Sequence, residues 1–224
     1  MKSVCCDALG TLIDISAISM KLDSKYPGRG IEIANLWRTK QVDYSRLRAM
    51  GGHYLPFGHI TRDALEATLV QLQCEYSEGD LDAVMLGYLD SVAFPDTRPF
   101  LAQLDIPWSI LTNGDRRFIR PILDHAGIDC LDSHLLTSDQ VETFKVDPKM
   151  YELAWTWAQQ SGSSTKSEVI FISANQWDAI AATWFGFTTC WVNRNSQAPE
   201  MLGSRPIVEV SSLSEIFTAV DLDS

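Results

Sequence analysis

Short apolar runs alternate with segments of helical periodicity through most of the chain. The first run, Ser3–Cys6, stops at Asp7 and is followed by a turn at Gly10, as expected of a buried strand that ends at a sheet edge. Further strand-like runs are expected over 108–112, 169–173, 188–193 and 207–210, and helices over 116–126, 148–160, 177–185 and 213–220. Strands that alternate with helices in this way predict a parallel sheet with helices on both faces.

The segment from about residue 15 to 95 has a different pattern. Apolar residues recur there with the period of a helix over Ile31–Met50, Thr61–Gln73 and Asp80–Ser91, and hardly any strand-like run is present. Thr61 is expected to cap the second of these helices. We therefore predict an α/β fold with a Rossmann-like core of residues 1–14 and 96–224. An all-helical cap of residues 15–95 interrupts this core after its first strand.

The composition is that of a folded protein with a strongly acidic balance. The 224 residues are 46% hydrophobic and 21% charged, which is enough apolar material for a sizeable core. The net charge of −11 disfavours a general nucleic-acid or acidic-membrane binder, because both functions need a basic surface. An anionic substrate is still compatible with this charge if a few cations are concentrated in one cleft.

The cysteines and histidines show no metal-binding or disulfide pattern. There is no CxxC pair, and the four histidines lack the spacing of a zinc site. Free thiols in a reducing cytoplasm are therefore expected. No stretch reaches the roughly 20 apolar residues of a membrane span, and the N-terminus reaches Asp7 too early for a signal peptide.

Polar side chains follow the predicted strands at the place where a ligand is expected. In open α/β sheets, ligands bind at the carboxyl ends of the strands. Asp7 follows the first strand, 112–114 (Thr-Asn-Gly) end the second, and 173–178 follow a later one. Lys145 lies in the loop before the helix that begins near Pro148. Each of these alone is more often a turn, cap or solvated residue, so the prediction depends on their combination and order.

This set resembles the haloacid dehalogenase superfamily. Its first motif is an Asp at the end of strand one with a Gly-Thr or similar pair shortly after, which is DALGT at 7–11 here. In detail the chain resembles the L-2-haloacid dehalogenase branch, over WRTKQVDYSRLR (37–48), ITRDALE (60–66), PDTRPFL (95–101), LTNGD (111–115), KVDPKMYELA (145–154) and SANQWDA (173–179). The resemblance covers essentially the whole chain. It implies hydrolysis of small anionic (S)-2-haloacids to (R)-2-hydroxyacids without a cofactor.

Two residues depart from the phosphatases of the superfamily. In those phosphatases a second Asp usually follows two residues after the first, where it protonates the leaving alcohol and activates water. Leu9 stands at that position here and can do neither. An acidic residue that supports magnesium is replaced by Ala174, and a hard divalent cation needs several oxygen ligands. Phosphoryl transfer is therefore disfavoured, and no metal is expected. Leu9 also replaces the Tyr usual in the dehalogenases, which changes one wall of the expected pocket.

The resemblance implies a catalytic role for seven residues. Asp7 is the nucleophile, whose carboxylate displaces the halide and forms an ester with the substrate. Arg38, from the cap, receives the departing halide, since a weakly hydrated guanidinium suits a large anion. Lys145 keeps Asp7 ionised. The groups expected to orient or deprotonate the hydrolytic water are Thr11, Ser173, Asn175 and Asp178, with Asp178 as the first choice of general base.

Seven further residues are expected to bind the substrate. The hydroxyl of Thr112 and backbone N–H groups at a helix start after Asn113 would hold its carboxylate. Asn113 also lies beside the departing halide, and Tyr151 helps with positioning. The apolar pocket is expected to be lined by Leu9, Val42, Phe57 and Trp177, although ordinary packing explains Val42 and Phe57 equally well.

Other functions remain open at the level of sequence. The same nucleophile could act on another 2-substituted acid, such as fluoroacetate or a strained-ring acid. The chain could also be a catalytically idle homologue that binds a small acid or a partner, while a phosphatase is the least favoured alternative. The resemblance further implies a homodimer, while the thiols, the charge and the hydropathy predict a cytoplasmic protein with no nucleic-acid or membrane partner.

Overall fold

A six-stranded parallel sheet forms the centre of the molecule, in a computed structural model that describes residues 1–220. The predicted α/β class is confirmed. The strand order is β5-β4-β1-β6-β7-β8, so the first strand lies in the middle of the sheet. The bounds are Ser3–Cys6 (β1), Trp108–Thr112 (β4), Leu135–Thr137 (β5), Val169–Ser173 (β6), Thr188–Val192 (β7) and Val208–Val210 (β8). All four residues of β1 are buried, as expected for a strand covered on both faces.

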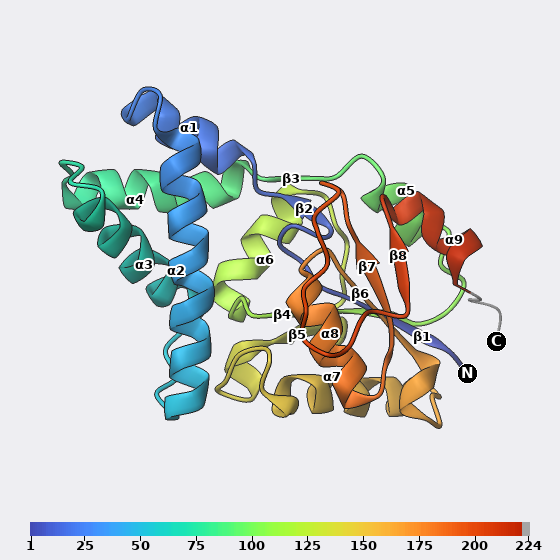
Figure 1. Ribbon diagram of the computed structural model, residues 1–224. Helices are drawn as coiled ribbons and strands as arrows, with labels where there is room; N and C mark the ends of the chain where they lie inside the picture. The colour runs from blue at the N-terminus through green and yellow to red at the C-terminus, as the bar shows by residue number, and fades with distance from the viewer. Residues whose placement is uncertain (221–224) are drawn as a thin grey trace.

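Helices cover both faces of this sheet (Figure 1). One face carries α5 (Thr97–Ala102), α6 (Arg116–His125) and α9 (Ile216–Ala219), and the other carries α7 (Pro148–Gln160) and α8 (Gln176–Phe185). Neighbouring side chains of a strand point to opposite faces, so that Cys6 and Ile110 pack with the first group while Cys5 and Leu111 pack with the second. Both faces of the sheet therefore have a buried apolar core.

The helical insertion stands to one side of the sheet (Figure 1). It consists of α1 (Ala17–Lys25), α2 (Gly30–Gly51), α3 (Phe57–Gln71) and α4 (Glu78–Leu86), followed by a 3-10 turn (Gly87–Asp90). Helix α2 packs against both α1 and α3. The chain enters and leaves this group through β2 (Ile13–Asp14) and β3 (Val92–Ala93), which pair antiparallel. The division into two domains at residues 14/15 and 95/96 stays a prediction.

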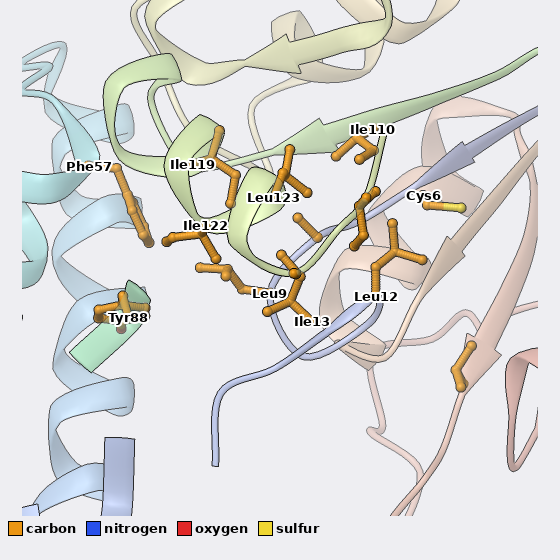
Figure 2. Packing of buried hydrophobic residues seen from close by; sticks show 14 of the residues in the cluster. Cys6, Leu9, Leu12, Ile13, Phe57, Tyr88, Ile110, Ile119, Ile122 and Leu123 are labelled. Atoms are coloured by element: carbon orange, nitrogen blue, oxygen red, sulfur yellow. The ribbon is translucent and has the colours of Figure 1, made fainter. Parts of the chain in front are cut away.

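The loop after β1 joins the sheet to the insertion through apolar contacts. Leu9 and Ile13 lie beside Ile122 of α6, and the same cluster reaches Phe57 and Tyr88 of the insertion (Figure 2). Leu9 is only 6% exposed. The apolar packing around this loop therefore fixes the positions of its polar residues, Asp7 and Thr11.

Several helix boundaries differ from the sequence-based expectations. Helix α3 begins at Phe57 rather than at Thr61, so the prediction that Thr61 caps a helix is wrong: its hydroxyl donates to Phe57 O inside the helix, at 2.7 Å. The helix expected from Asp80 begins at Glu78, because Ser77 and Asp80 form a capping box, and it ends at Leu86. The segment expected as a helix over 213–220 is a 3-10 turn followed by the short α9.

All five cysteines are free thiols, as predicted, and four of them are buried while Cys74 is half-buried. Burial raises the pKa of the Cys5 thiol to about 12, so this group stays protonated at neutral pH. Within residues 1–220, the structure contains no helix of the length and hydropathy required to cross a bilayer.

Candidate active site

The carboxyl edge of the sheet brings the predicted catalytic residues together. Asp7 comes directly after β1, Thr112 ends β4, and Ser173 ends the neighbouring strand β6. Lys145 reaches the same edge from the loop that precedes α7. Because β1 lies between β4 and β6, the Asp7 carboxylate is at the centre of this edge.

Asp7 is 6% exposed, and the two oxygens of its carboxylate have different surroundings. Oδ2 accepts hydrogen bonds from Thr11 Oγ1 and Asn175 Nδ2, both at 2.9 Å, and lies 3.5 Å from Ser173 Oγ. Oδ1 accepts only from Lys145 Nζ, at 3.0 Å, among the described residues. A carboxylate oxygen has two lone pairs. Oδ1 therefore has one lone pair that is not used in a hydrogen bond and is available for bond formation.

Lys145 is fully buried between two carboxylates. Its ammonium donates to Asp7 Oδ1 and, at 2.8 Å, to Asp178 Oδ2. Burial alone would lower the pKa of Lys145, but the negative charges of Asp178 and Asp7 outweigh this and raise its pKa above the usual value. The lysine therefore remains a cation at neutral pH and compensates the charge of both acids.

Asp178 lies behind Lys145, with no exposed surface. Its oxygens also accept from Ser173 Oγ at 3.1 Å and from the Tyr151 hydroxyl at 2.8 Å. Burial raises the pKa of Asp178, and the charge of Lys145 opposes this rise. Burial and the neighbouring Asp178 also raise the pKa of Tyr151 well above its usual range, so the phenol is the donor in this pair.

The helical insertion contributes Arg38 to the same site. Its Nη2 donates to Asn175 Oδ1 at 3.2 Å, and its Nη1 donates to Gln41 Oε1 at 2.6 Å. Asn175 therefore bridges Arg38 of the insertion and Asp7 of the sheet. A second contact between these parts is the guanidinium of Arg46, which lies 4.8 Å from the centroid of the Trp177 ring.

A cavity of about 20 Å³ lies between these groups. Of the fourteen residues predicted for the site, those on its wall are Asp7, Leu9, Arg38, Val42, Phe57, Thr112, Asn113, Lys145, Asn175 and Trp177. Thr11, Ser173, Tyr151 and Asp178 do not line it in the described chain. Thr11 and Ser173 contact Asp7 of the wall, Asp178 contacts Lys145, and Tyr151 bonds to Asp178. Gln41 and Gly114 also line it and were not predicted. Gln41 lies three residues after Arg38, which is the spacing of neighbours on one helix face.

The surroundings of Thr112 and Asn113 differ from the expected anion site. Helix α6 begins only at Arg116, and two of its first N–H groups are already engaged: Arg116 N donates to Asp139 and Phe118 N to the capping Asp115. Thr112 Oγ1 accepts from Gly114 N at 3.1 Å. The N–H groups of Arg116 and Phe118 are thus taken up by aspartates, and a carboxylate site at Thr112 and Asn113 stays a prediction. Asn113 Oδ1 instead fixes the Lys145 backbone N–H, at 2.7 Å.

A larger cleft of about 950 Å³ lies outside the inner cavity. The wall shared by the two spaces is formed by Leu9, Arg38, Val42, Asn175 and Trp177. The inner cavity has room for about one water molecule. These five residues therefore stand between Asp7 and the larger cleft.

The two carboxylates of the site, Asp7 and Asp178, surround the ammonium of Lys145 rather than a metal-binding position. Among residues 1–220, no group of three or more His, Cys, Asp or Glu side chains is placed to hold a metal ion. The ammonium of Lys145 is within 3.0 Å of Asp7 Oδ1 and 2.8 Å of Asp178 Oδ2. Leu9 and Ala174, which lie nearby, offer no side-chain oxygen ligand.

Comparisons with known proteins agree on one family. The family model for haloacid dehalogenase-like hydrolases matches residues 1–186. The (S)-2-haloacid dehalogenase of Pseudomonas sp. (strain YL) is 36% identical over 219 residues, which cover 96% of this chain and 93% of that protein. A crystal structure of an L-2-haloacid dehalogenase matches with a TM-score of 0.92 and 33% identity over 97% of both chains. The Xanthobacter autotrophicus enzyme with chloropropionic acid covalently bound matches with a TM-score of 0.86 and 31% identity, over 96% of both.

Proposed function

Because the chain belongs to the haloacid dehalogenase-like hydrolases, we propose that it hydrolyses (S)-2-haloacids to (R)-2-hydroxyacids through an ester of Asp7. The observation that carries this proposal is the small cavity between Asp7 and Arg38. It places a carboxylate oxygen with a free lone pair and a guanidinium around one small space. A nucleophile and an acceptor for a leaving anion are the two groups that displacement of a halide needs.

In the first step, Asp7 Oδ1 attacks the α-carbon of the substrate. The new O–C bond forms as the carbon–halogen bond breaks, and the halide leaves with that electron pair on the opposite side, so the configuration at the α-carbon inverts. A hydrated carboxylate is a weak nucleophile, but Asp7 is largely buried and held by three hydrogen bonds shorter than 3.1 Å. Such fixed alignment contributes several kcal/mol to a displacement reaction.

In the second step, water adds to the Asp7 carboxyl carbon and the ester bond breaks. One oxygen of Asp7 then comes from water, and the hydroxyl of the product carries the former Oδ1. Lys145 stabilises the negative charge that develops at this carboxyl. Asp178 is our candidate base for the water, acting through Ser173, whose hydroxyl lies between it and Asp7.

The two cations on the cavity wall, Arg38 and Lys145, can bind an anionic substrate although the protein as a whole is acidic. Arg38 would bind the departing halide on the side of the cavity toward the helical insertion, and Asn113 lies on the same cavity wall. We propose that Lys145, the Thr112–Gly114 segment and Asn175 hold the substrate carboxylate once the cavity has opened. Phe57, Val42 and Trp177 supply the apolar wall that keeps bulk water away.

Halide release is expected to be independent of divalent metal ions. The purified protein should release free halide from (S)-2-chloropropanoate at the same rate with and without EDTA, because Leu9 and Ala174 leave Asp7 and Asp178 without further acidic ligands. Halide and the hydroxyacid enantiomer are measured together. Loss of activity with the chelator, restored by magnesium, would contradict the proposal. Silence on every haloacid would favour a strained-ring acid as substrate, and binding without turnover would favour an idle homologue.

Leu9 is expected to affect which 2-haloacids are accepted. It forms part of the wall between the inner cavity and the outer cleft, so a larger side chain there narrows the space for the substituent on the α-carbon. In Leu9→Tyr, kcat/KM for 2-bromohexanoate should fall about tenfold relative to that for 2-bromopropanoate. Leu9→Met, which conserves volume, is the matched control. An unchanged ratio in the folded Tyr variant would show that the substituent does not pass Leu9.

We propose that the protein acts as a homodimer. The helical insertion carries exposed apolar side chains that a second copy would cover, among them Ile31, Leu47 and Met50. Four buried, unpaired thiols suit a reducing compartment, and we therefore place the activity in the cytoplasm.

A further inference from the structure

Gln41 is a buried polar residue next to the proposed halide acceptor. It lies on α2, is 1% exposed and borders the inner cavity. Its side chain makes three hydrogen bonds: Oε1 accepts from Arg38 Nη1 at 2.6 Å, and Nε2 donates to Thr61 Oγ1 at 2.8 Å and to the Tyr88 hydroxyl at 3.2 Å. A buried amide with these partners has one fixed position.

The hydrogen bonds also fix which end of the amide faces Arg38. Thr61 Oγ1 gives its only proton to Phe57 O, at 2.7 Å, so toward Gln41 this hydroxyl can only accept. The NH₂ group of Gln41 must therefore point to Thr61, and the carbonyl oxygen to Arg38. A guanidinium has donors alone, so the two requirements agree. Helix α3 thus sets the orientation of the amide through Thr61.

The partner of Arg38 on this side is neutral. In the described part of the chain, Arg38 makes no salt bridge with a carboxylate; its two hydrogen-bond partners are the amide oxygens of Gln41 and Asn175. An ion pair would divide the charge of the guanidinium between a protein carboxylate and the halide. A neutral acceptor holds the group in place and leaves its charge for a bound anion.

We propose that Gln41 is a positioning residue that aims the Arg38 guanidinium at the leaving halide and keeps its charge available. This inference rests on the proposed function, because it assigns the halide to Arg38. Gln41 acts on the alkylation step, in which the carbon–halogen bond breaks, and not on hydrolysis of the ester. Its effect therefore belongs in kcat/KM, which includes steps only up to the first irreversible one, and should depend on the halogen.

The test is a double-mutant cycle between Gln41 and Arg38. In Gln41→Met, which keeps the side-chain length without the amide, kcat/KM for 2-chloropropanoate should fall roughly 10- to 100-fold. The loss should be smaller for 2-bromopropanoate, because bromide is a better leaving group and needs less stabilisation. In the Arg38→Lys background the same substitution should cost less than about threefold, since a flexible ammonium no longer depends on Gln41.

Ser45→Ala is the matched control. Ser45 lies one turn further along α2, is equally buried, and donates to Gln41 O without touching Arg38 or the cavity. It should keep kcat/KM within about threefold of the wild-type value. If Gln41→Met fails to fold, Gln41→Glu takes its place: it keeps the acceptor, adds a carboxylate against Arg38, and should also lose at least about tenfold in kcat/KM.

The outcomes separate this inference from the proposed function. Halide release by the wild-type protein tests the function itself. If the wild type is active and a folded Gln41 variant keeps kcat/KM within threefold, the positioning role is overturned while the function stands. An equal loss in the wild-type and Arg38→Lys backgrounds would also overturn it, since Gln41 would then act independently of Arg38.

Discussion

A single turnover in water enriched in oxygen-18 is expected to place the label in the peptide that contains Asp7, and not in the released hydroxyacid. The reason is the path of the oxygen atoms: the substrate carbon takes Oδ1 of Asp7, and water then restores the carboxylate at its carboxyl carbon. The experiment uses enzyme in excess over (S)-2-chloropropanoate, followed by proteolysis and mass spectrometry of the peptide and the product. Label in the first hydroxyacid would mean direct attack by water on the substrate and would overturn the ester mechanism.

Removal of the Asp7 carboxylate is expected to abolish most of the activity. Asp7→Ala should lower kcat at least about a thousand-fold, which is the scale seen when a covalent nucleophile is lost. Asp7→Asn should behave alike at first, but an asparagine here can deamidate and restore Asp7, so its peptide mass is checked before and after the assay. Asp105, an exposed carboxylate that lines neither the inner cavity nor the outer cleft, supplies the control variant Asp105→Asn. Full turnover by the Ala variant would contradict the role of Asp7.

Replacement of Lys145 is expected to give the largest loss of stability. In Lys145→Met two buried carboxylates lose their common cation, and the free energy of unfolding at pH 7 should fall by about 3–5 kcal/mol. Activity should be lost as well, because Asp7 Oδ1 loses its hydrogen-bond donor. The control is Lys149→Met on the exposed start of α7, which should change stability by less than about 0.5 kcal/mol. Denaturant unfolding of both variants measures the difference.

The stability deficit of Lys145→Met should grow with pH. Burial already raises the pKa of Asp178, and the charge that opposes this rise is that of Lys145, so the variant has a still higher pKa at this carboxyl. A group whose pKa is raised on folding binds more protons in the folded state, and stability falls as pH rises through the interval from the unfolded value, about 4, to the folded one. The deficit should therefore be larger at pH 8 than at pH 5. A deficit that is constant with pH would contradict this coupling.

The sheet was predictable from sequence because its central strands are short, continuous apolar runs. Ser3–Cys6 and Val169–Ser173 have the observed bounds, and the carboxyl ends of parallel strands necessarily meet at one edge. The strand Leu135–Thr137 was not predicted, since three residues are too few to show a period. The start of α3 was misplaced because Thr61 resembles a capping residue, while its hydroxyl in fact bonds within the helix.

The sequence allowed most residues of the site to be predicted, but not the hydrogen bonds that join them. The positions of Asp7, Arg38 and Lys145 follow from motifs, and the structure brings all three to one cavity. The contacts of Gln41 with Thr61 and Tyr88 join segments 20 and 47 residues apart, and no local pattern encodes such a meeting. The occupied start of α6 depends likewise on Asp139, which lies 23 residues from Arg116.

The small volume beside Asp7 has a consequence for substrate entry. A haloacid is several times larger than the single water that fits there. The side chains between this space and the outer cleft come from both the sheet edge and the helical insertion, so we expect some of them to move when a substrate enters. A movement slower than bond breaking would limit turnover.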